Sequence, residues 1–415
     1  MYGSQCTFNG EIHNWHRIIL GFPDHLVGTL LDRLHLNSEH RVLDPFCGTG
    51  TTLVECMKRD IACIGIEANP ACVFSARVKT HWDIRPGTLR QCLEKIIVAY
   101  GKYMRRSVRY KLDPAYIYLS NTGMIERGWI SPMPLQKAIA LRSAIQELDT
   151  TKPYKDALTL ALLSEVVNGA SNVKFGPQLY CAPPKVDSDV LGGFKKRVEN
   201  IAKDLTVVSE LHRPTVGVLD GDSRDCGKLV YSGSPMRRFD AVICSPPYPT
   251  EHDYTRHTRL ELAFLDAVSD TATVRAIKQR MIRSHTKGIY KQDTDGEDLR
   301  VHPQIGPIVQ EIEKKALSKT HGFARLYGRV VLEYFAGMKK HLNSVSRILR
   351  PGAKCGYVLG DQASYLQVLI PTAEILSSLA RDEGFDVLGI EKWRGRWSTA
   401  TSRIVDENIL FLRRP

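Results

Sequence analysis

Residues 44–51 read Asp-Pro-Phe-Cys-Gly-Thr-Gly-Thr, a glycine-rich turn between a short apolar run and a helical pattern. Residues 40–46 predict a strand that ends in this turn, and residues 51–60 predict the helix that follows it. Gly48 and Gly50 let the backbone approach a ligand closely, and the free N–H groups of the helix start lie beside them. The stretch therefore predicts an α/β fold with a ligand site at the end of a strand.

A second strand is predicted at residues 62–67, and it ends in an acidic side chain, Glu67. In dinucleotide-binding folds an acidic residue at this place holds a ribose diol. Binding of NAD or FAD would need a third glycine where this chain has Leu53, and the sequence contains no G-x-x-x-x-G-K-[ST] phosphate loop. The pattern therefore indicates a nucleoside ligand and counts against a dinucleotide, and a glycine turn without a ligand is the remaining alternative.

After a long, mainly helical stretch, strands and helices alternate again from residues 215–225, where a predicted strand ends in acidic turn residues. Asp222 in this turn could accept a hydrogen bond from an adenine amine, but Gly-Asp is also ordinary turn chemistry. Its position between the glycine turn and the next motif favours the first interpretation.

Ser245-Pro246-Pro247-Tyr248 follows an apolar strand predicted at residues 241–244. The two prolines fix φ and remove two N–H donors. The carbonyls of Ser245 and Pro246 then form a rigid pair of acceptors, and Tyr248 adds a flat aromatic face. This combination suits an exocyclic amine on a planar base, whose stacking contributes ~1–3 kcal/mol. A plain turn after a strand is the alternative.

These motifs together resemble the class I S-adenosylmethionine-dependent methyltransferases, specifically those that methylate amines of DNA bases. Residues 44–51 are similar to the FxGxG cofactor motif of that family, and residues 245–248 to its [DNS]PP[YFW] catalytic motif. The resemblance covers about 44–80 and 215–415 and reaches back to 13–34, which is similar to the family's helix before the cofactor turn. It implies a seven-stranded Rossmann-like sheet, carrying here a large and mainly helical insertion, with S-adenosylmethionine as cofactor and DNA as partner.

The resemblance also implies roles for individual residues. It assigns the ribose to Glu67, the adenine to Asp222, the flipped base to Ser245, Pro246, Pro247 and Tyr248, and the methionine end of the cofactor to residues near Trp15. The remaining cofactor-binding residues are those of the glycine turn, Asp44, Pro45, Phe46, Gly48, Gly50 and Thr51.

The first residue of the catalytic motif tends to separate substrates in that family. Ser is typical of cytosine-N4 enzymes and Asp of adenine-N6 enzymes, so Ser245 favours cytosine N4, with adenine N6 as an alternative. No Pro-Cys dipeptide occurs, which counts against covalent methylation at cytosine C5. The implied chemistry is direct in-line methyl transfer to a base flipped out of the duplex, without a metal ion. An RNA guanine-N2 methyltransferase and a non-catalytic binding protein remain as alternatives.

Two blocks interrupt the α/β pattern. Residues 84–212 are mainly helical in pattern, and we interpret them as an insertion that is a candidate target-recognition region. Residues 1–83 and 213–415 then form the catalytic domain, within which residues 250–325 are a basic, helix-rich segment. Which of the two blocks reads the DNA sequence, or whether both do, stays open.

Basic residues interleave with aromatic residues at 102–111 and 275–291, and the basic side chains of both runs could contact DNA phosphates. Solvated surface is the alternative for each run. The predicted substrate contacts are Arg256, Arg259, Lys278 and Arg283. We interpret residues 394–397 (Arg-Gly-Arg-Trp) as a turn between the last two strands, with a phosphate contact as the alternative.

The remaining elements are predicted from periodicity and turn residues. A long helix is expected at residues 330–349, closed by Arg350-Pro351-Gly352, with a strand at 354–359 after it. A helix at 371–382 and strands at 385–391 and 408–413 complete the sheet.

Composition agrees with a nucleic-acid partner. The 415 residues include 57 Lys and Arg against 45 Asp and Glu, a formal net charge of +12, which favours a polyanion. Ten cysteines without CxxC or zinc-ligand spacing predict reduced thiols in the cytoplasm. No apolar run reaches the ~18 residues of a membrane span, and the N-terminus lacks a secretory pattern. Since no metal-binding carboxylate cluster is apparent, we expect any restriction endonuclease to be a separate chain, and the oligomeric state stays unknown.

Overall fold

The computed structural model describes residues 11–18, 21–105, 109–175, 179–231, 238–319, 322–398 and 401–415. The chain divides into two compact units that alternate along the sequence. Unit 1 comprises residues 1–21, 74–213 and 257–273, and unit 2 comprises residues 22–73, 214–256 and 274–415.

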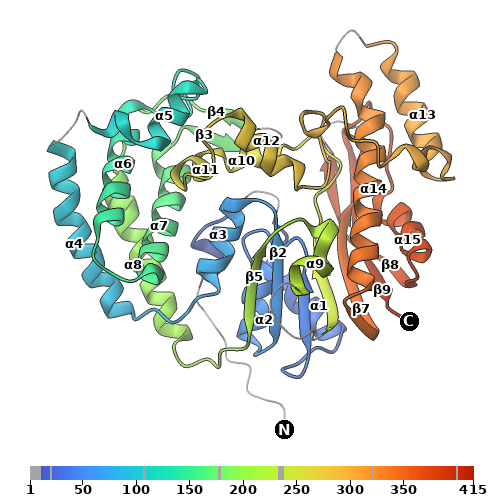
Figure 1. Cartoon of the computed structure of the whole chain (residues 1–415), viewed down its shortest axis with the longest axis horizontal. Helices are drawn as coiled ribbons and strands as arrows, with labels where there is room; N and C mark the ends of the chain where they lie inside the picture. The colour runs from blue at the N-terminus through green and yellow to red at the C-terminus, as the bar shows by residue number, and fades with distance from the viewer. Residues whose placement is uncertain are drawn as a thin grey trace. The chain divides into compact units, whose positions relative to one another are not determined.

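Unit 2 is built on a seven-stranded sheet in the order β5-β2-β1-β6-β7-β9-β8 (Figure 1). The pairs β5–β2, β2–β1, β1–β6 and β6–β7 are parallel, and β9 runs antiparallel to both of its neighbours. The prediction of an α/β fold with a seven-stranded sheet is confirmed. The strands are β1 (Arg41–Asp44), β2 (Ala62–Glu67), β5 (Val216–Asp220), β6 (Phe239–Cys244), β7 (Leu349–Gly360), β8 (Asp386–Ser398) and β9 (Arg403–Arg413).

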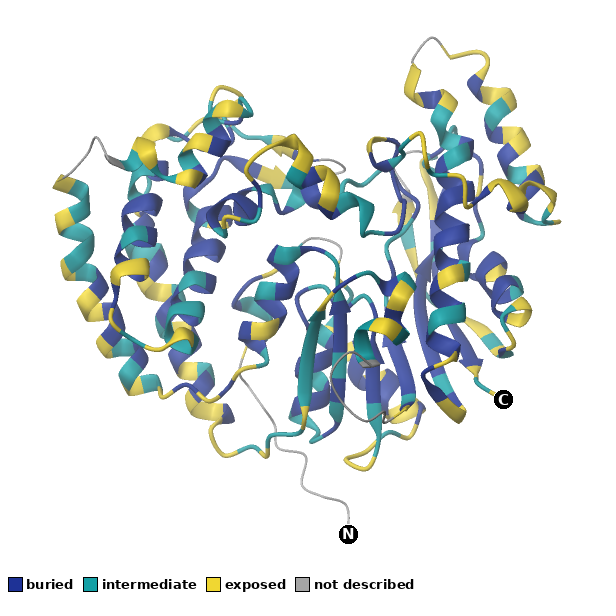
Figure 2. Cartoon of the chain, in the orientation of Figure 1, coloured by how far each residue is buried: buried dark blue, intermediate teal, exposed yellow. Residues whose placement is uncertain are grey.

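Helices cover both faces of this sheet, and neighbouring residues of β7 show which helix covers which face. A Cβ on Gly356 would meet Leu30 of α1 at 3.5 Å, whereas Tyr357 joins the core cluster formed with α14 and α15. Successive strand residues point to opposite faces, so α1 and α14 lie on opposite sides. The central strands β1, β6 and β7 and the helix α14 are largely buried, whereas the edge strands β5 and β8 are more exposed (Figure 2). The helices that complete unit 2 are α1 (Asp24–Arg33), α2 (Thr51–Lys58), α9 (Cys226–Tyr231), α13 (Ile305–Ala316), α14 (Tyr327–Ser346) and α15 (Thr372–Asp382).

Unit 1 is mainly helical, as predicted for the insertion. Pro occupies the first turn of α5, α6 and α7, where its missing N–H costs no hydrogen bond. Asp113 caps α5 by accepting from the N–H of Ala115 at 2.8 Å, and its other oxygen pairs with the buried Arg142 of α6 at 2.5 Å. The helices are α4 (Pro86–Arg105), α5 (Pro114–Asn121), α6 (Pro132–Glu147), α7 (Lys152–Glu165), α8 (Val190–Val208) and α11 (Arg259–Phe264).

A short antiparallel pair in unit 1 was not predicted. β3 (Val173–Phe175) pairs with β4 (Leu179–Cys181), where the sequence suggested irregular chain at 176–184. Three residues are too few to show a two-residue periodicity, which explains why the strands were missed. Three further helices have the bounds α3 (Pro70–Lys79), α10 (Tyr254–His257) and α12 (Thr271–Gln279).

Two predictions near the carboxyl terminus are wrong. Arg350-Pro351-Gly352 does not close a helix, because α14 ends at Ser346 and these residues lie within β7, beside a break in its register with β6. Pro is tolerated at such irregular strand positions. Residues 394–397 do not form a turn but lie within β8, paired with β9. Gly395 suggested a turn, yet it makes room for Ile404, whose Cγ2 would lie 2.5 Å from a Cβ at this position.

The nine cysteines among the described residues are free thiols, and Cys6 lies outside those residues. No helix in the described part of the chain is long and apolar enough to cross a membrane.

We expect Gly65→Ala to destabilise the chain by about 1–3 kcal/mol, because the new methyl would lie 2.7 Å from Cys47 Sγ and 2.8 Å from Leu53 Cδ1, both buried. Denaturant unfolding measures the change. Gly217→Ala on the adjacent strand is the matched control, since its Cβ would meet Ile64 at an ordinary 3.8 Å. Equal effects of the two substitutions would show that close packing at Gly65 is not the cause.

Candidate active site

Parallel pairing brings three sequence motifs to one edge of the sheet. Leu43 of β1 is in register with Ile64 of β2 and with Val242 of β6. The carboxyl ends of these strands therefore lie side by side, and so do the chain segments that leave them. Those segments are the glycine turn after Asp44, Glu67 with the residues after it, and the turn that begins at Ser245.

The glycine turn needs its glycines for their backbone conformation. Gly48 has φ +51° and Gly50 has φ +87°, a region that side chains disfavour. Gly50 is also the N-cap of α2, whose first helical residue is Thr51. The N–H of Cys47 donates to the carbonyl of Ile66 at 3.1 Å, which fastens the turn to β2.

Glu67 braces the glycine turn. Its Oε2 accepts from the N–H of Gly48 at 3.0 Å, and its Oε1 accepts from the N–H of Asn69 at 2.8 Å. Burial raises the pKa of Glu67, and these two N–H groups oppose that rise. Each carboxylate oxygen keeps a second lone pair, so the brace leaves acceptor capacity for a ligand hydroxyl.

Asp44 is fully buried at the end of β1, and one of its oxygens is unused. Oδ1 accepts from the N–H of Phe46 at 3.0 Å, whereas Oδ2 makes no hydrogen bond of ordinary geometry among the described residues. The buried hydroxyl of Thr52, which also lacks a partner of ordinary geometry, lies near the carboxylate and lowers its pKa. Burial raises the pKa of Asp44 to about 7. A buried acceptor without a partner beside a glycine turn fits a site that a polar ligand completes.

His341 on α14 joins the glycine turn to the neighbouring motifs, and sequence reasoning missed it. Its ring lies 4.7 Å from the ring of Phe46, centroid to centroid. Nδ1 lies 2.9 Å from the carbonyl of Ser223, and Nε2 lies 2.9 Å from the hydroxyl of Tyr357. Since a carbonyl can only accept, Nδ1 carries the proton and Nε2 accepts from Tyr357. Burial lowers the pKa of His341 to about 4, so the ring is neutral at pH 7.

Asp222 follows β5 and forms an ion pair with Arg224. The carboxylate accepts from the backbone N–H of Arg224 at 2.9 Å and from its guanidinium at 2.5 Å. Both residues line a groove of about 870 Å³, together with residues of α9 and α14. The predicted contact of Asp222 with adenine stays a prediction.

Neighbouring groups hold the turn of Ser245 to Tyr248. The Oγ of Ser245 lies 3.4 Å from the hydroxyl of Tyr248, and the backbone N–H of Tyr248 donates to the hydroxyl of Tyr254 at 3.2 Å. The Tyr248 ring packs against the backbone of Gly360 so closely that a Cβ there would lie 2.8 Å from Cε2. Burial raises the pKa of Tyr248 and raises that of Tyr254 to about 12, so both remain neutral phenols.

The chain that follows this turn is also held in place. Glu251 has φ +64°, and its carboxylate accepts from the N–H and the hydroxyl of Thr286, each at 2.9 Å. Its own N–H donates to the carbonyl of Ser284 at 3.1 Å. Asp253 forms an ion pair with Lys278 at 2.5 Å, and this pair lowers the pKa of Asp253 against the effect of burial. These contacts, all within the chain, fix the segment that follows the Ser-Pro-Pro-Tyr turn.

Two of the four cations that we predicted to contact substrate lie in buried ion pairs. Lys278 pairs with Asp253, and both side chains are about nine-tenths buried. Arg283 pairs with both oxygens of Asp293, at 2.9 and 3.0 Å, and donates to backbone carbonyls as well. These partners account for both cations structurally, and a phosphate contact by either stays a prediction.

The other two cations have different surroundings. Arg256, in α10, is exposed. Arg259 belongs to unit 1, where it donates to the hydroxyl of Tyr118 at 3.1 Å. Lys287 and Lys291 in the second basic run are exposed, and residues 106–108 of the first run lie outside the described residues.

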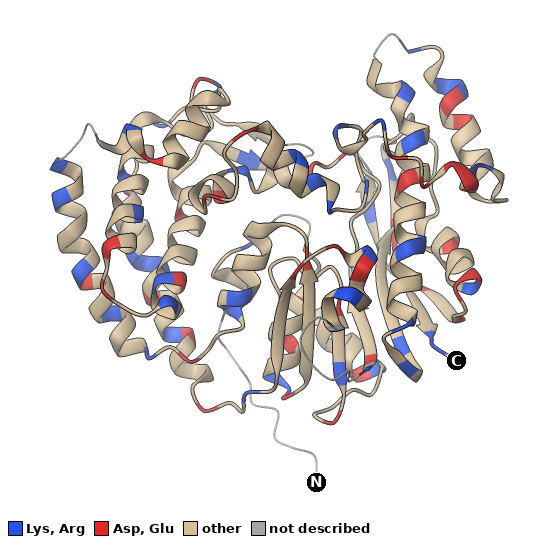
Figure 3. Ribbon diagram, viewed as in Figure 1, with Lys and Arg blue, Asp and Glu red and all other residues tan. Residues whose placement is uncertain are grey.

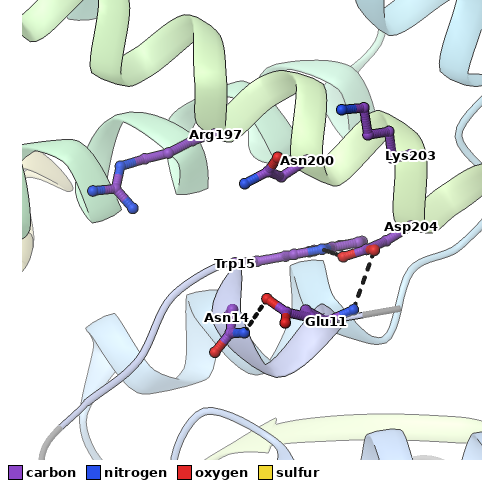
Figure 4. Close-up of a pocket in the computed structure, with 7 residues that line it drawn as sticks. All are labelled: Glu11, Asn14, Trp15, Arg197, Asn200, Lys203 and Asp204. Carbon is purple, nitrogen blue, oxygen red and sulfur yellow. Dashed lines mark hydrogen bonds between the residues drawn. The ribbon is translucent and has the colours of Figure 1, made fainter. Parts of the chain in front are cut away.

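Trp15 is anchored within unit 1 (Figure 4). Its side chain is buried, and its indole N–H donates to Asp204 Oδ2 at 2.8 Å, while the N–H of Glu11 donates to Asp204 Oδ1 at 3.1 Å. A pocket of about 200 Å³ beside it is lined by further residues of α8, among them Arg197 and Lys203. A contact between this region and the cofactor stays a prediction.

We expect His341→Asn to change the pH dependence of stability between pH 6.5 and pH 4. The pKa of His341 is about 4 in the folded chain, below its ordinary value, so the unfolded chain binds more protons in this range. His341 should therefore contribute a decrease in the free energy of unfolding as the pH falls, whereas Asp44, with its raised pKa, contributes in the opposite direction. The variant should lack the contribution of His341, so the difference between wild type and variant should change across this range.

Denaturant unfolding at several pH values measures this difference. His25→Asn, at a side chain that is 73% exposed, is the control and should keep the wild-type profile. A wild-type profile for His341→Asn would contradict the neutral, buried state of this ring.

Comparisons with known proteins agree with this site. The family model described as DNA methylase matches residues 16–76, which include β1, the glycine turn, β2 and part of α3. The type II methyltransferase M.BsoBI of Geobacillus stearothermophilus is 22% identical over 99% of this chain and 86% of its own length. M.MvaI of Kocuria varians is 23% identical over 82% of this chain and 74% of its own. M.AvaI of Nostoc sp. is 23% identical over 90% of this chain and 79% of its own length.

The residues present fit S-adenosylmethionine. Glycine conformations at 48 and 50, an acidic side chain at the end of β2 and the unpartnered oxygen of Asp44 form a polar cradle for a nucleoside with a charged tail. The sheet and the matches make the chain similar to DNA methylases of the N4/N6 type, and the cradle fits S-adenosylmethionine as the methyl donor.

Proposed function

We propose that this chain transfers a methyl group to the exocyclic N4 amine of cytosine in DNA. The main observation in support is that two turns lie side by side at one edge of the sheet. The Ser-Pro-Pro-Tyr turn follows β6, and the glycine turn follows the neighbouring strand β1. A donor bound in the first turn and a base held in the second would then be neighbours. Ser245 in the first position of the motif favours cytosine over adenine, by resemblance to the family.

The turn supplies positioning, which is the main demand of direct methyl transfer. Bound S-adenosylmethionine supplies a methyl group on a positively charged sulfur. The backbone carbonyls of Ser245 and Pro246 would accept hydrogen bonds from the target amine, so that its lone pair points to the methyl carbon. The nitrogen–carbon bond forms as the carbon–sulfur bond breaks, and an amine proton leaves for solvent afterwards.

Tyr248 would stack on the flipped base. Burial raises its pKa, so the ring stays an uncharged phenol, and contact with Gly360 and Tyr254 restricts its motion. A stacking surface that is fixed before the base arrives saves the entropy of ordering it afterwards.

DNA as the substrate agrees with the charge of the chain. A net charge of +12 favours a polyanion, and Arg256 is exposed only eight residues after Tyr248. The names of the relatives point to a type II restriction–modification system, in which we propose a separate endonuclease and a cytoplasmic location. The helical region 84–212 and the basic segment 250–325 remain the candidates for target recognition.

The reaction product tests the proposal. The purified chain is incubated with S-adenosylmethionine and mixed-sequence duplex DNA, with tRNA in parallel, and the digested nucleosides are separated by mass spectrometry. We expect N4-methylcytosine from the DNA. N6-methyladenine would overturn the choice of base and keep DNA methylation, whereas methylation of the tRNA alone would overturn DNA as the substrate.

We expect Tyr248→Ala to lower kcat/KM for methyl transfer roughly tenfold to a hundredfold, the equivalent of a lost stacking contact of ~1–3 kcal/mol. The Kd for S-adenosylmethionine, measured by calorimetry, should stay unchanged. Tyr248→Phe keeps the ring and is the matched control, expected to retain most of the activity. Equal loss in both variants would assign the effect to the hydroxyl and its contact with Ser245 instead.

A further inference from the structure

The β8–β9 hairpin extends past the rest of the sheet at the edge that carries the candidate site. β9 pairs with β7 as far as Glu407, opposite Gly360, and the carbonyl of Asp406 accepts from the N–H of Asp361 at 2.8 Å. Residues 403–405 lie beyond these contacts and are paired with β8. Because β7 is parallel to β6, its carboxyl end lies at the same edge as Ser245. We call Gly395–Trp397 together with Arg403–Asp406 the ribbon end.

Hydrogen bonds tie the ribbon end to the catalytic turn. The guanidinium of Arg396 donates to Gln362 Oε1 at 3.0 Å, and Gln362 Nε2 donates to the carbonyl of Gly360 at 3.1 Å. Gly360 in turn packs against the ring of Tyr248. After burial, the charge of Arg396 is the second cause that lowers the pKa of His252, four residues beyond Tyr248. The ribbon end therefore lies close to the place where the target base would be held.

The two faces of the ribbon end differ. Arg396 is in register with the buried Val405, and this face is turned toward Gln362. The opposite face carries Trp397 and Ile404, which are in register with each other and are 61% and 67% exposed. A large aromatic and a branched aliphatic side chain thus form an exposed apolar pair on the outer face.

One exposed cation, Arg403, lies beside this apolar pair. The other three basic residues between 392 and 407 form ion pairs across the ribbon, Lys392 with Asp406 and both Arg394 and Arg396 with Glu407. Lys and Arg of β8 are blue in Figure 3. Arg394 lies over the ring of Trp393 at 4.1 Å and pairs with the buried Glu407 of β9, so it braces the ribbon. Cations that meet phosphates and apolar side chains that meet sugars or base steps are the two contacts DNA-binding ribbons use.

We propose that the ribbon end is a DNA-contacting surface, which binds the duplex beside the flipped base. Trp397 and Ile404 contact the sugar or base edge, and Arg403 contacts a phosphate. Arg396 keeps the ribbon end at a fixed place relative to Tyr248. The inference rests on DNA being the substrate, and it adds a contact surface apart from the two blocks named above.

The test uses the full chain with Trp397→Ala and with Arg403→Gln, both at exposed side chains. Affinity for a fluorescently labelled mixed-sequence duplex is measured by anisotropy over a range of salt concentrations, and affinity for S-adenosylmethionine by calorimetry. We expect each variant to bind DNA about tenfold more weakly, and Arg403→Gln to reduce the salt dependence by about one phosphate contact. The Kd for S-adenosylmethionine should not change.

Two matched controls lie on the same strands, within the sheet. Arg413→Gln removes a half-exposed arginine at the other end of β9, and Leu388→Ala removes a half-exposed aliphatic side chain of β8. Both should bind DNA as the wild type does. A loss of affinity in the controls equal to that in the ribbon variants would overturn the assignment to the ribbon end.

Other outcomes separate this inference from the proposed function. If the wild type binds and methylates DNA and both ribbon variants do so equally well, the ribbon end is not a DNA contact, and the proposed function stands. If the wild type binds no duplex and methylates tRNA alone, both proposals fall. If Trp397→Ala changes only the sedimentation of the chain, from dimer to monomer, the surface joins two copies instead.

Discussion

The pairing of β1 between β2 and β6 is the constraint on which the site depends. Parallel strands bring all their carboxyl ends to one edge, so the glycine turn and the Ser-Pro-Pro-Tyr turn become neighbours although almost 200 residues separate them in sequence. A slip by one residue would turn the buried Leu43 to the opposite face and misplace both turns. The apolar core that fixes this register therefore also sets the geometry of the chemistry.

Buried polar side chains then hold the turns at this edge. Glu67 fixes the glycine turn, His341 joins Phe46 to the turn after β5, and Glu251 fastens the chain beyond the catalytic motif. Burying such groups is costly unless their hydrogen bonds are made, and here they are largely made within the chain. Asp44 Oδ2 and the hydroxyl of Thr52 are among the buried polar atoms that make no hydrogen bond within the described part of the chain, and both lie at this edge of the sheet.

The sequence predicted those strands and helices that are marked by residues within or next to the element itself. The bounds of β2 agree with the predicted range of 62–67, because an apolar run and the residues after it mark the strand. The contacts that hold the site are not local: Phe46 meets His341, Tyr248 meets Gly360, and Gln362 meets Arg396. Likewise, a run of cations shows its charge but not its partners, and only the structure revealed that Asp253 and Asp293 neutralise Lys278 and Arg283. A lone histidine in the apolar pattern of α14 was the one available hint of His341.

The order of the last three strands has a further consequence for how the molecule avoids self-association. Because β9 lies between β7 and β8, the free edge of the sheet on this side is β8, and an open edge invites pairing with another chain. Its register with β9 breaks between Val387 and Gly389 and again between Lys392 and Arg394, and charged side chains occupy much of the strand. Breaks in register and charged side chains on an edge strand make a poor template for added strands. The edge is thus protected from aggregation while it displays an exposed tryptophan.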